Sequence, residues 1–222
     1  MLATIITEEQ WQKLKSILLD LNVYDKPSLK KTFLGIIYRL KTGCQWRYLP
    51  SCYGKANTVF KAFRRWSATG LFYKLFKRLI QRADTEWISI DATHVRAHQS
   101  SAGAVGGGHQ NIAKSIGGNS SKIHLAVDAH GNPLEFLVGD GITHDIKIAP
   151  MLLQLLDLKD TEFLNADKGY DSKEFRNLAY TKGVRANIQR KKNARTSNSH
   201  MDWLIYQARH VVKNTFANLK HY

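Results

Sequence analysis

The stretch WISIDATHV, residues 87–95, decides the fold. Ile88 and Ile90 alternate with polar positions, whereas the residues before this stretch repeat apolar side chains every three or four positions. Alternation with a period of two is typical of a half-buried strand. Asp91 follows the apolar pair directly, and an ionised carboxylate in such a strand is costly unless a cation compensates it. The stretch therefore predicts the start of a sheet and a candidate site within it.

Further strands and helices follow this stretch. Residues 122–129 and 133–139 show the same alternation, and Gly131, Asn132 and Pro133 between them indicate a hairpin turn. Helical and strand patterns then alternate, with helices at 145–158, 172–183 and 205–220 and strands at 162–167 and 184–189. Three meandering strands followed by this alternation predict an α/β domain over residues 84–222, in which helices flank a mixed sheet.

One segment between the first two strands lacks either pattern. Residues 98–121 are rich in Gly and Ser and almost free of large apolar side chains. This composition predicts an exposed loop inserted into the domain, most often without chemistry of its own.

The residues before the sheet form a second region, 1–83, that is helical throughout. Four helices are expected, at 7–21, 28–43, 55–70 and 71–83, with Thr7 and Ser28 as N-caps and Gly43 as a helix end. The third helix turns Lys61, Arg64 and Arg65 outward. Two helices joined by a bend, the second basic, suggest a helix-turn-helix that reads a DNA major groove. A helical bundle with a solvent-exposed basic face explains the same sequence pattern equally well.

Composition indicates a polyanionic partner. The chain has 33 Lys and Arg against 18 Asp and Glu, a formal net charge of +15. Such an excess favours nucleic acid, and contact with RNA fits it as well as contact with DNA. No apolar run approaches the roughly 18 residues of a membrane-spanning helix, and no export signal marks the amino terminus. We therefore expect a cytoplasmic protein without a membrane partner.

Two carboxylates end neighbouring strands of the expected sheet, Asp91 and Asp167. Mg²⁺ takes one or two protein carboxylates together with water and phosphate oxygens. Two such ions about 4 Å apart serve the attacking and leaving oxygens of a phosphodiester. Aspartates at strand ends also cap helices and form turns, and spacing alone leaves both interpretations open.

The last expected helix carries a cationic stripe. At 100° per residue, Tyr206, Arg209, Lys213 and Lys220 fall within about 60° of one another. They lie opposite an apolar stripe of Leu204, Ala208, Val211 and Leu219, which we expect to be buried. The basic run QRKKNAR, residues 189–195, precedes this helix.

These segments together resemble a known family. SIDATHVRAH, KIHLAVDAHGNPLEF, THD, NADKGYD and the last helix are similar, in this order, to the transposases of bacterial insertion sequences in the family named after insertion sequence five. Residues 8–66 resemble the helical DNA-binding region that precedes the catalytic core in that family. The resemblance runs over nearly the whole chain.

The resemblance implies a ribonuclease H-like core with an Asp, Asp, Glu triad. The triad binds Mg²⁺ or Mn²⁺ and cuts and rejoins double-stranded DNA at terminal inverted repeats and at a target. It also implies a dimer on DNA in the bacterial nucleoid. Mapped by motif, Asp91 and Asp167 are the catalytic and metal-binding aspartates, and Arg190 and Lys191 resemble a phosphate-contacting loop.

The third acid comes from a family signature of Tyr, Arg, Glu and Lys. Tyr206, Arg209 and Lys220 keep its spacing and would grip DNA, but Lys213 stands at the Glu position. A protonated lysine has no lone pair with which to ligate a metal. We therefore favour an inactive copy over one in which Asp145 or Glu174 takes over as the third acid.

Two further functions stay open. One is a non-catalytic DNA-binding protein derived from a transposase, occupying inverted repeats through residues 28–67. The other is a structure-selective nuclease on the same fold. The chain ends two residues after Lys220, where the family usually continues into helical sequence, so we expect a truncated carboxyl end.

Overall fold

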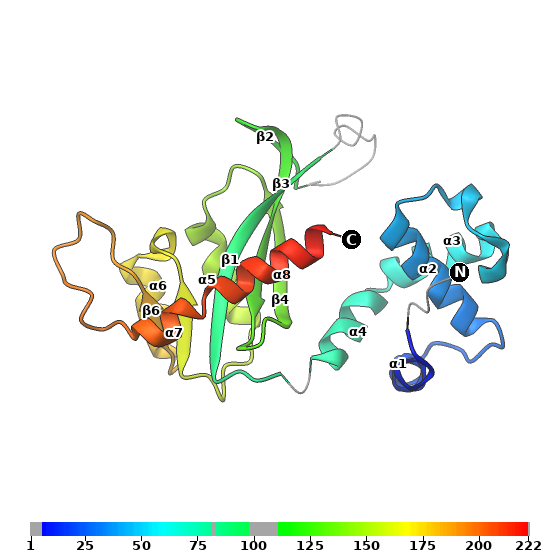
Figure 1. Cartoon of the computed structure of the whole chain (residues 1–222), viewed down its shortest axis with the longest axis horizontal. Coiled ribbons are helices and arrows are strands. Elements are labelled where there is room, and N and C mark those ends of the chain that lie inside the picture. Colours follow the sequence, from blue (N-terminus) through cyan, green and yellow to red (C-terminus); the bar gives the residue numbers. More distant parts are fainter. Residues whose placement is uncertain (1–5, 81–82, 98–110, 222) are drawn as a thin grey trace. The chain divides into compact units, whose positions relative to one another are not determined.

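The computed structural model describes residues 6–80, 83–97 and 111–221. The chain divides into two compact units, residues 1–81 and 82–221. The first unit is helical and the second combines a sheet with helices, as Figure 1 shows. The expected α/β fold with a helical region before it is confirmed.

The first unit contains the four expected helices. They are α1 (Glu8–Asp20), α2 (Leu29–Thr42), α3 (Ala56–Ala68) and α4 (Leu71–Leu79), with the short turns η1 (Trp46–Tyr48) and η2 (Ser51–Tyr53) between α2 and α3. Thr7 caps α1 as expected, because its Oγ1 accepts from the Gln10 N–H at 3.2 Å. Gly43 ends α2 in the left-handed conformation, φ 66°. The cap expected from Ser28 is wrong: its backbone, at ψ 1°, is not extended and its side chain makes no cap hydrogen bond.

The connection between α2 and α3 is part of the core of this unit. It spans residues 43–55, whereas the turn of a helix-turn-helix has three or four residues. Leu49 and Tyr53 of the connection are both buried, and a Cβ on Gly35 of α2 would lie 3.0 Å from the Tyr53 Cβ. The helical character and the long connection implied by the expected helices at 28–43 and 55–70 are therefore confirmed, and this connection is longer than the turn of a helix-turn-helix.

The second unit is built on a six-stranded sheet. Its strands are β1 (Trp87–Arg96), β2 (Ala113–Ser115), β3 (Gly118–Val127), β4 (Pro133–Asp140), β5 (Phe163–Ala166) and β6 (Arg185–Ile188). The order is β2-β3-β1-β5-β6, and β4 also pairs with β3. β3 runs antiparallel to β1, β2 and β4, whereas β5 runs parallel to β1 and β6. This arrangement confirms the ribonuclease H-like mixed sheet that the resemblance implied.

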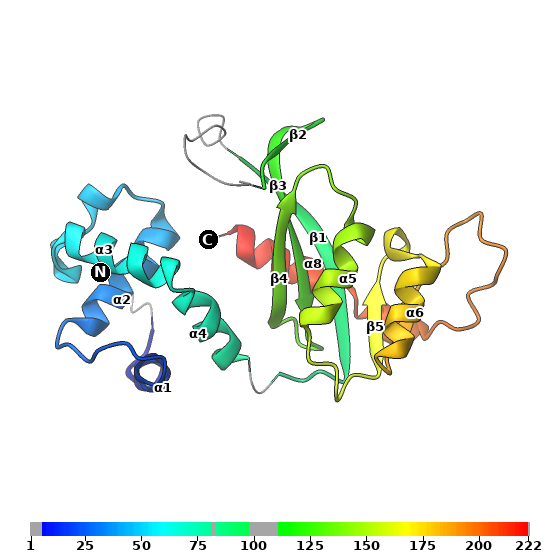
Figure 2. The same cartoon turned by 180° about the vertical axis from the view of Figure 1, so that it is seen from behind.

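Helices cover both faces of the sheet. α5 (Asp145–Leu155) and α6 (Lys173–Thr181) lie on one face, seen from the front in Figure 2, and pack on Ile88, Ile90 and Leu164. α8 (His210–Lys220) crosses the other face, as Figure 1 shows. Its Val212 and Phe216 pack on Leu125 and Val127 of β3. The two faces therefore have separate apolar cores.

The loop expected over residues 98–121 is wrong in its last part. Residues 98–110 lie outside the described residues, but 113–115 form β2 and 118–121 begin β3. Residues 116 and 117 form the turn between these strands, and Gly118, at φ 98°, begins β3. This hairpin was not predicted because its side chains are small and polar. Strand pairing requires only backbone hydrogen bonds, whereas the other strands were predicted from their alternating apolar side chains.

The last helix is broken, so its expected buried stripe is confirmed only in part: Val211 packs against the core beneath α8, whereas Leu204 and Leu219 do not. α7 (Trp203–Gln207) and α8 are separate, and tight hydrogen bonds at their junction join Arg209 N–H to Tyr206 O (3.1 Å) and Val212 N–H to Arg209 O (3.3 Å). Such turns have three residues rather than 3.6, so a single helical wheel fails across them. Leu204 is 82% exposed and Leu219 is 48% exposed, whereas Val212 and Phe216 are buried.

Gly131 sets the distance between the β3–β4 hairpin and α8. The Thr215 Oγ1 donates to the Gly131 carbonyl at 2.7 Å, and a Cβ on Gly131 would lie 2.7 Å from the Val211 Cγ1. We expect Gly131→Ala to lower the free energy of unfolding by about 2 to 4 kcal/mol, because a clash adds to the strain of φ 86°. Urea unfolding measures this change.

A matched control separates the clash from the strain. Gly183 has a similar φ of 79°, but a Cβ there would meet nothing within 4 Å. Gly183→Ala should therefore cost about 1 to 2 kcal/mol less than Gly131→Ala. Equal losses for the two variants would show that Gly131 does not hold α8 close to the sheet.

Candidate functional site

Asp91 lies on β1, and Asp167 directly follows the parallel neighbouring strand β5. β1 pairs with β5 through Trp87–Phe163, Ile88–Leu164 and Ser89–Asn165. The same offset relates Asp91 to Asp167, and each lies two residues beyond Ser89 or Asn165 on the same face. Neighbouring strands are about 4.8 Å apart. The two aspartates are therefore placed side by side at one end of the sheet, on the face that α8 crosses.

Asp91 is held between opposing charges. Its side chain is 16% exposed and accepts a hydrogen bond from the Ala92 N–H at 2.8 Å. The Arg209 Nη1 lies 3.6 Å from its Oδ2. Burial raises the pKa of Asp91, and the Asp167 carboxylate adds to this, whereas the Ala92 N–H, Arg209 and Lys213 oppose it. Asp167 and Lys213 are therefore both within electrostatic reach of Asp91.

Asp167 has a second role in the backbone. Its Oδ1 accepts from the Gly169 N–H at 2.7 Å and so caps the short turn η4 (Lys168–Tyr170). The capping interpretation and the metal interpretation of this aspartate are thus compatible, because its other oxygen is not used by the cap.

Arg209, at the junction of α7 and α8, and Lys220 of α8 lie on the same face. Besides Arg209 at Asp91, Lys220 donates from Nζ to the Thr93 Oγ1 of β1 at 2.7 Å. The Tyr206 ring centroid lies 5.5 Å from the Arg209 guanidinium carbon. Lys213, between them in sequence, is exposed. The structure therefore brings this predicted set of side chains to the strand that carries the first aspartate.

A row of buried polar side chains supports the site and was missed in the sequence. Asn187 of β6 donates to the Asn165 Oδ1 at 2.8 Å and to the Asp202 carbonyl at 2.9 Å. The Asp202 N–H donates back to the Asn187 Oδ1 at 3.0 Å. The row fastens the start of α7 to the sheet next to Ser89. The only feature of the sequence that indicated this row was an asparagine within each of two short, mostly apolar strands.

The remaining predicted DNA contacts lie elsewhere. Lys61, Arg64 and Arg65 are exposed on α3, in the helical unit. Lys191 is exposed. Arg190 is only partly exposed, and its Nη1 lies 3.3 Å from the Asp171 Oδ1. The basic run therefore offers Lys191 to a partner more openly than Arg190.

Asp171 anchors this basic run. It accepts from the Arg176 Nε at 2.9 Å and from the Lys191 N–H at 3.1 Å. Burial favours its neutral form, but these hydrogen bonds and the charges of Arg176 and Arg190 together lower the pKa of Asp171 below its ordinary value. A carboxyl with a lowered pKa contributes stability above its unfolded pKa of about 3.9 and loses it as the pH falls through the folded pKa.

Asp171→Asn is expected to lower the free energy of unfolding by about 2 to 4 kcal/mol at pH 7, since it leaves Arg176 without a charged partner. The difference from the unchanged chain should shrink below about pH 4 and vanish in stronger acid. Thermal unfolding of both proteins between pH 7 and pH 2.5 tests this. A difference that does not depend on pH would contradict the paired carboxylate.

The two acids considered as replacements for the third carboxylate lie on the other face. Asp145, at the start of α5, is 3.0 Å from the Lys122 Nζ and 3.8 Å from the buried His124 Nδ1. His124 is opposite Ala92, so its side chain faces away from the Asp91 side. Glu174 is exposed on α6, which packs in the core of that same opposite face. Neither therefore adds a carboxylate beside Asp91 and Asp167.

No third ligand completes the site among the described residues. In residues 6–80, 83–97 and 111–221, no three His, Cys, Asp or Glu side chains gather closely enough to hold a metal ion. This agrees with a pair of carboxylates beside a lysine.

Two families match the chain in series. Residues 6–76 match a family described as "Putative transposase of IS4/5 family". Residues 82–222, more than half of the chain, match a family described as "Transposase DDE domain". The chain belongs to the DDE transposase family. The family expected from the sequence motifs is thereby confirmed.

Relatives of this transposase-family chain include bacterial insertion-sequence proteins. A Brucella ovis protein named "Putative transposase for insertion sequence element IS6501" is 34% identical over 104 residues, 46% of this chain and 78% of that protein. "Uncharacterized protein y4sN" of Sinorhizobium fredii is 38% identical over 70 residues, 32% of this chain and 56% of that protein. The chain thus spans little more than half of the second relative.

Solved transposase structures show weaker likeness. A piggyBac transposase synaptic complex with hairpin DNA covers 82% of this chain at 10% identity and a TM-score of 0.46, and this chain covers 48% of it. The Mos1 strand transfer complex covers 98% of this chain at 11% identity and a TM-score of 0.34, with 79% of that chain covered. Such low identity assigns no residue.

No helix within the described ranges is both long and apolar enough to cross a bilayer.

Proposed function

We propose that this transposase-family chain binds the DNA ends of a bacterial insertion sequence and lacks the third acid needed to cut them. The observation that supports the proposal is the strand pairing that ends at Ser89–Asn165 and directs Asp91 and Asp167, two residues further along, to one face of the sheet, beside Arg209. That arrangement suits phosphodiester chemistry, in which carboxylates hold divalent ions and cations hold phosphates.

The two aspartates fit the donor set of Mg²⁺ or Mn²⁺. A pair of carboxylates can hold such an ion when water and phosphate oxygens complete its shell, so Asp91 and Asp167 would be the protein ligands. The ion would supply a polarised phosphoryl group and an activated attacking oxygen. Both carboxylates must be ionised to bind it, and the cation of Arg209 keeps Asp91 closer to that state.

Arg209 and Lys220 would position the DNA strand. The Arg209 guanidinium can bind a phosphate through two parallel N–H groups, and it stands next to Asp91. Lys220 sits against Thr93, which lies two residues, or about 7 Å, further along β1. The two cations would therefore contact separate phosphates of one strand, with the Tyr206 ring supporting the guanidinium.

Lys213 would permit binding but oppose cleavage. A unit charge pair at 4 Å is worth about 4 kcal/mol at an effective dielectric near 20, so a lysine in place of an acid repels a divalent ion that the acid would attract. The same lysine attracts DNA phosphates. We therefore place the chain closer to a non-catalytic DNA-binding descendant of a transposase than to an active enzyme.

The partner proposed is double-stranded DNA carrying terminal inverted repeats. An insertion sequence has two ends and the family resemblance implies a dimer on DNA, so we propose that one copy of the chain binds each end. The exposed cations of α3 would contribute to this binding from the helical unit.

Gel-shift and cleavage assays on one duplex test the proposal. With EDTA, the duplex carrying element ends should bind with an affinity that falls steeply as salt is raised. With Mn²⁺, it should bind and stay intact. Failure to bind at low salt would overturn the DNA-binding function. Cleavage of this duplex by the unchanged chain would overturn the role given to Lys213, and cleavage of branched DNA alone would favour the structure-selective nuclease.

A further inference from the structure

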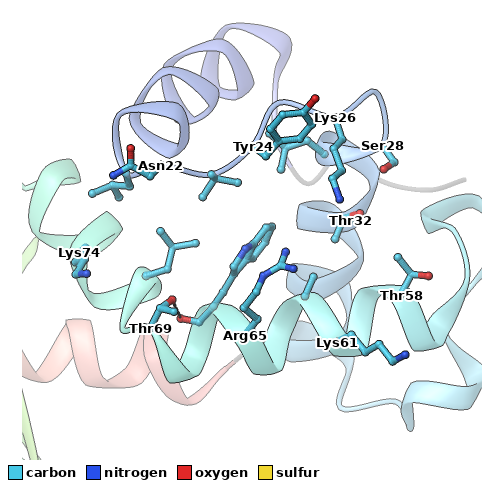
Figure 3. A pocket seen from close by; sticks show the side chains of 16 residues that line it. Asn22, Tyr24, Lys26, Ser28, Thr32, Thr58, Lys61, Arg65, Thr69 and Lys74 are labelled. Atoms are coloured by element: carbon cyan, nitrogen blue, oxygen red, sulfur yellow. Dashed lines mark hydrogen bonds between the residues drawn. The ribbon is translucent and has the colours of Figure 1, made fainter.

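A pocket of about 730 Å³ opens in the helical unit. It lies between the segment that joins α1 to α2, the start of α2, α3 and the start of α4, as Figure 3 shows. All of its lining residues belong to this one unit. The volume is in the range of pockets that hold small organic molecules and is far larger than a single phosphate needs.

The rim of this pocket is cationic. Lys26, Lys61, Arg65 and Lys74 line it, and no Asp or Glu does so among the described residues. None of these cations forms an ion pair with a carboxylate of the described chain. Figure 3 shows Lys26 and Arg65 reaching into the pocket from opposite walls. Because their charges are uncompensated, the pocket favours an anion.

A hydroxyl group on a largely buried residue also lines this space. Thr32 of α2 is only 9% exposed, and Figure 3 places it between Lys26 and Arg65. Its side chain has no hydrogen bond within residues 6–80, 83–97 and 111–221. The Thr32 oxygen is not sealed from solvent, so the hydroxyl can donate to a phosphate oxygen that Lys26 and Arg65 attract into the pocket.

The floor of the pocket is apolar, and its rim carries an aromatic ring. Leu29, Trp66 and Leu71 line the floor and are buried. Tyr24 is 76% exposed at the rim, with the Lys26 Nζ 5.9 Å from its ring centroid. Cations for the backbone and aromatic faces for the bases are the usual means of binding single strands. A duplex keeps its bases stacked inside and would leave this floor empty.

We propose that the pocket binds an unpaired nucleotide of a DNA strand. Its phosphate lies between Lys26, Thr32 and Arg65, and its base lies against the apolar floor and Tyr24. The proposal rests on the proposed function, since the nucleotide belongs to DNA that the chain handles. It assigns to the helical unit a contact with displaced or frayed bases, in addition to any contact with duplex phosphates.

Calorimetric titration of the full chain tests the pocket. The probes are deoxyadenosine monophosphate, inorganic phosphate and a short single strand. The mononucleotide should bind about tenfold more tightly than inorganic phosphate. Thr32→Val and Arg65→Ala should each weaken binding of the mononucleotide and of the single strand by about tenfold, because each substitution removes a hydrogen bond to the charged phosphate. Circular dichroism melting checks that the Thr32→Val chain folds. Because Arg65 is exposed, Arg65→Ala is not expected to affect folding.

Arg78→Ala is the matched control. Arg78 is exposed on α4 outside the pocket, and its loss changes the net charge equally. Equal weakening by Arg78→Ala, no weakening by either pocket variant, or phosphate binding as tightly as the nucleotide would overturn the proposal. Gel shifts with duplex DNA separate the two proposals. If the chain binds duplex DNA normally but does not bind the mononucleotide, only the pocket proposal is wrong. If the chain binds the mononucleotide through the pocket but does not bind duplex DNA, only the proposed function is wrong.

Discussion

Lys213→Glu is expected to create Mn²⁺-dependent cleavage of DNA that carries element ends, at a rate at least about a hundredfold above that of the unchanged chain. The glutamate would add the third carboxylate on the face that holds Asp91 and Asp167, where a lysine now stands within electrostatic reach of Asp91. Replacing repulsion by attraction toward a divalent ion changes the interaction by several kcal/mol. Quantifying nicked product over time measures the rate.

Three controls make this result specific. Lys213→Gln removes the cation without supplying a ligand and should stay inactive. Asn214→Glu adds the same negative charge at the next exposed position of α8 and should stay inactive as well. Asp91→Asn placed in the Lys213→Glu chain should abolish the new cleavage. Cleavage by Asn214→Glu at the same rate would mean that position 213 has no special relation to the aspartates.

The second large effect concerns the packing of α8 on the sheet. Phe216 is 6% exposed and packs with Val212 on Leu125 and Val127. Phe216→Ala should lower the free energy of unfolding by about 3 to 5 kcal/mol, because it removes a buried ring and leaves a cavity. Urea unfolding gives the loss, and hydrogen exchange of the α8 amides shows whether the helix loosens first.

Leu219→Ala provides the comparison within the same helix. Leu219 is 48% exposed, so its truncation should cost less than about 1 kcal/mol. A single unbroken helix from residue 205 to 220 would place Leu219 in the buried stripe and reverse the order of the two losses. A larger loss for Leu219→Ala would therefore contradict the broken helix and the placement of Lys213 that depends on it.

Much of the fold follows from patterns within single segments. β1, β3 and β4 each have an apolar alternation that marks them as strands, and the caps at Thr7 and Gly43 mark helix ends. β2 and the start of β3 lack such a pattern, since their pairing depends on backbone hydrogen bonds between two polar segments. The junction near Arg209 was missed because a helical wheel assumes one constant period.

The site divides in the same way. Asp91 and Asp167 could be selected because a carboxylate at the end of an apolar strand needs an explanation, and motif spacing pointed to Lys213. The hydrogen-bonded pair Asn165 and Asn187 could not be predicted, because the two side chains meet only when β5 and β6 pair in the folded sheet. The pairing of Arg190 with Asp171 likewise joins segments that no local pattern connects.

The most direct test of the central claim is anomalous diffraction from crystals of the Lys213→Glu chain with Mn²⁺ and an element-end duplex. We predict a manganese peak in contact with carboxylate oxygens of both Asp91 and Asp167, and its disappearance in Asp167→Asn. A peak that touches neither aspartate, or one that persists unchanged in Asp167→Asn, would contradict the claim that these two side chains form the metal site.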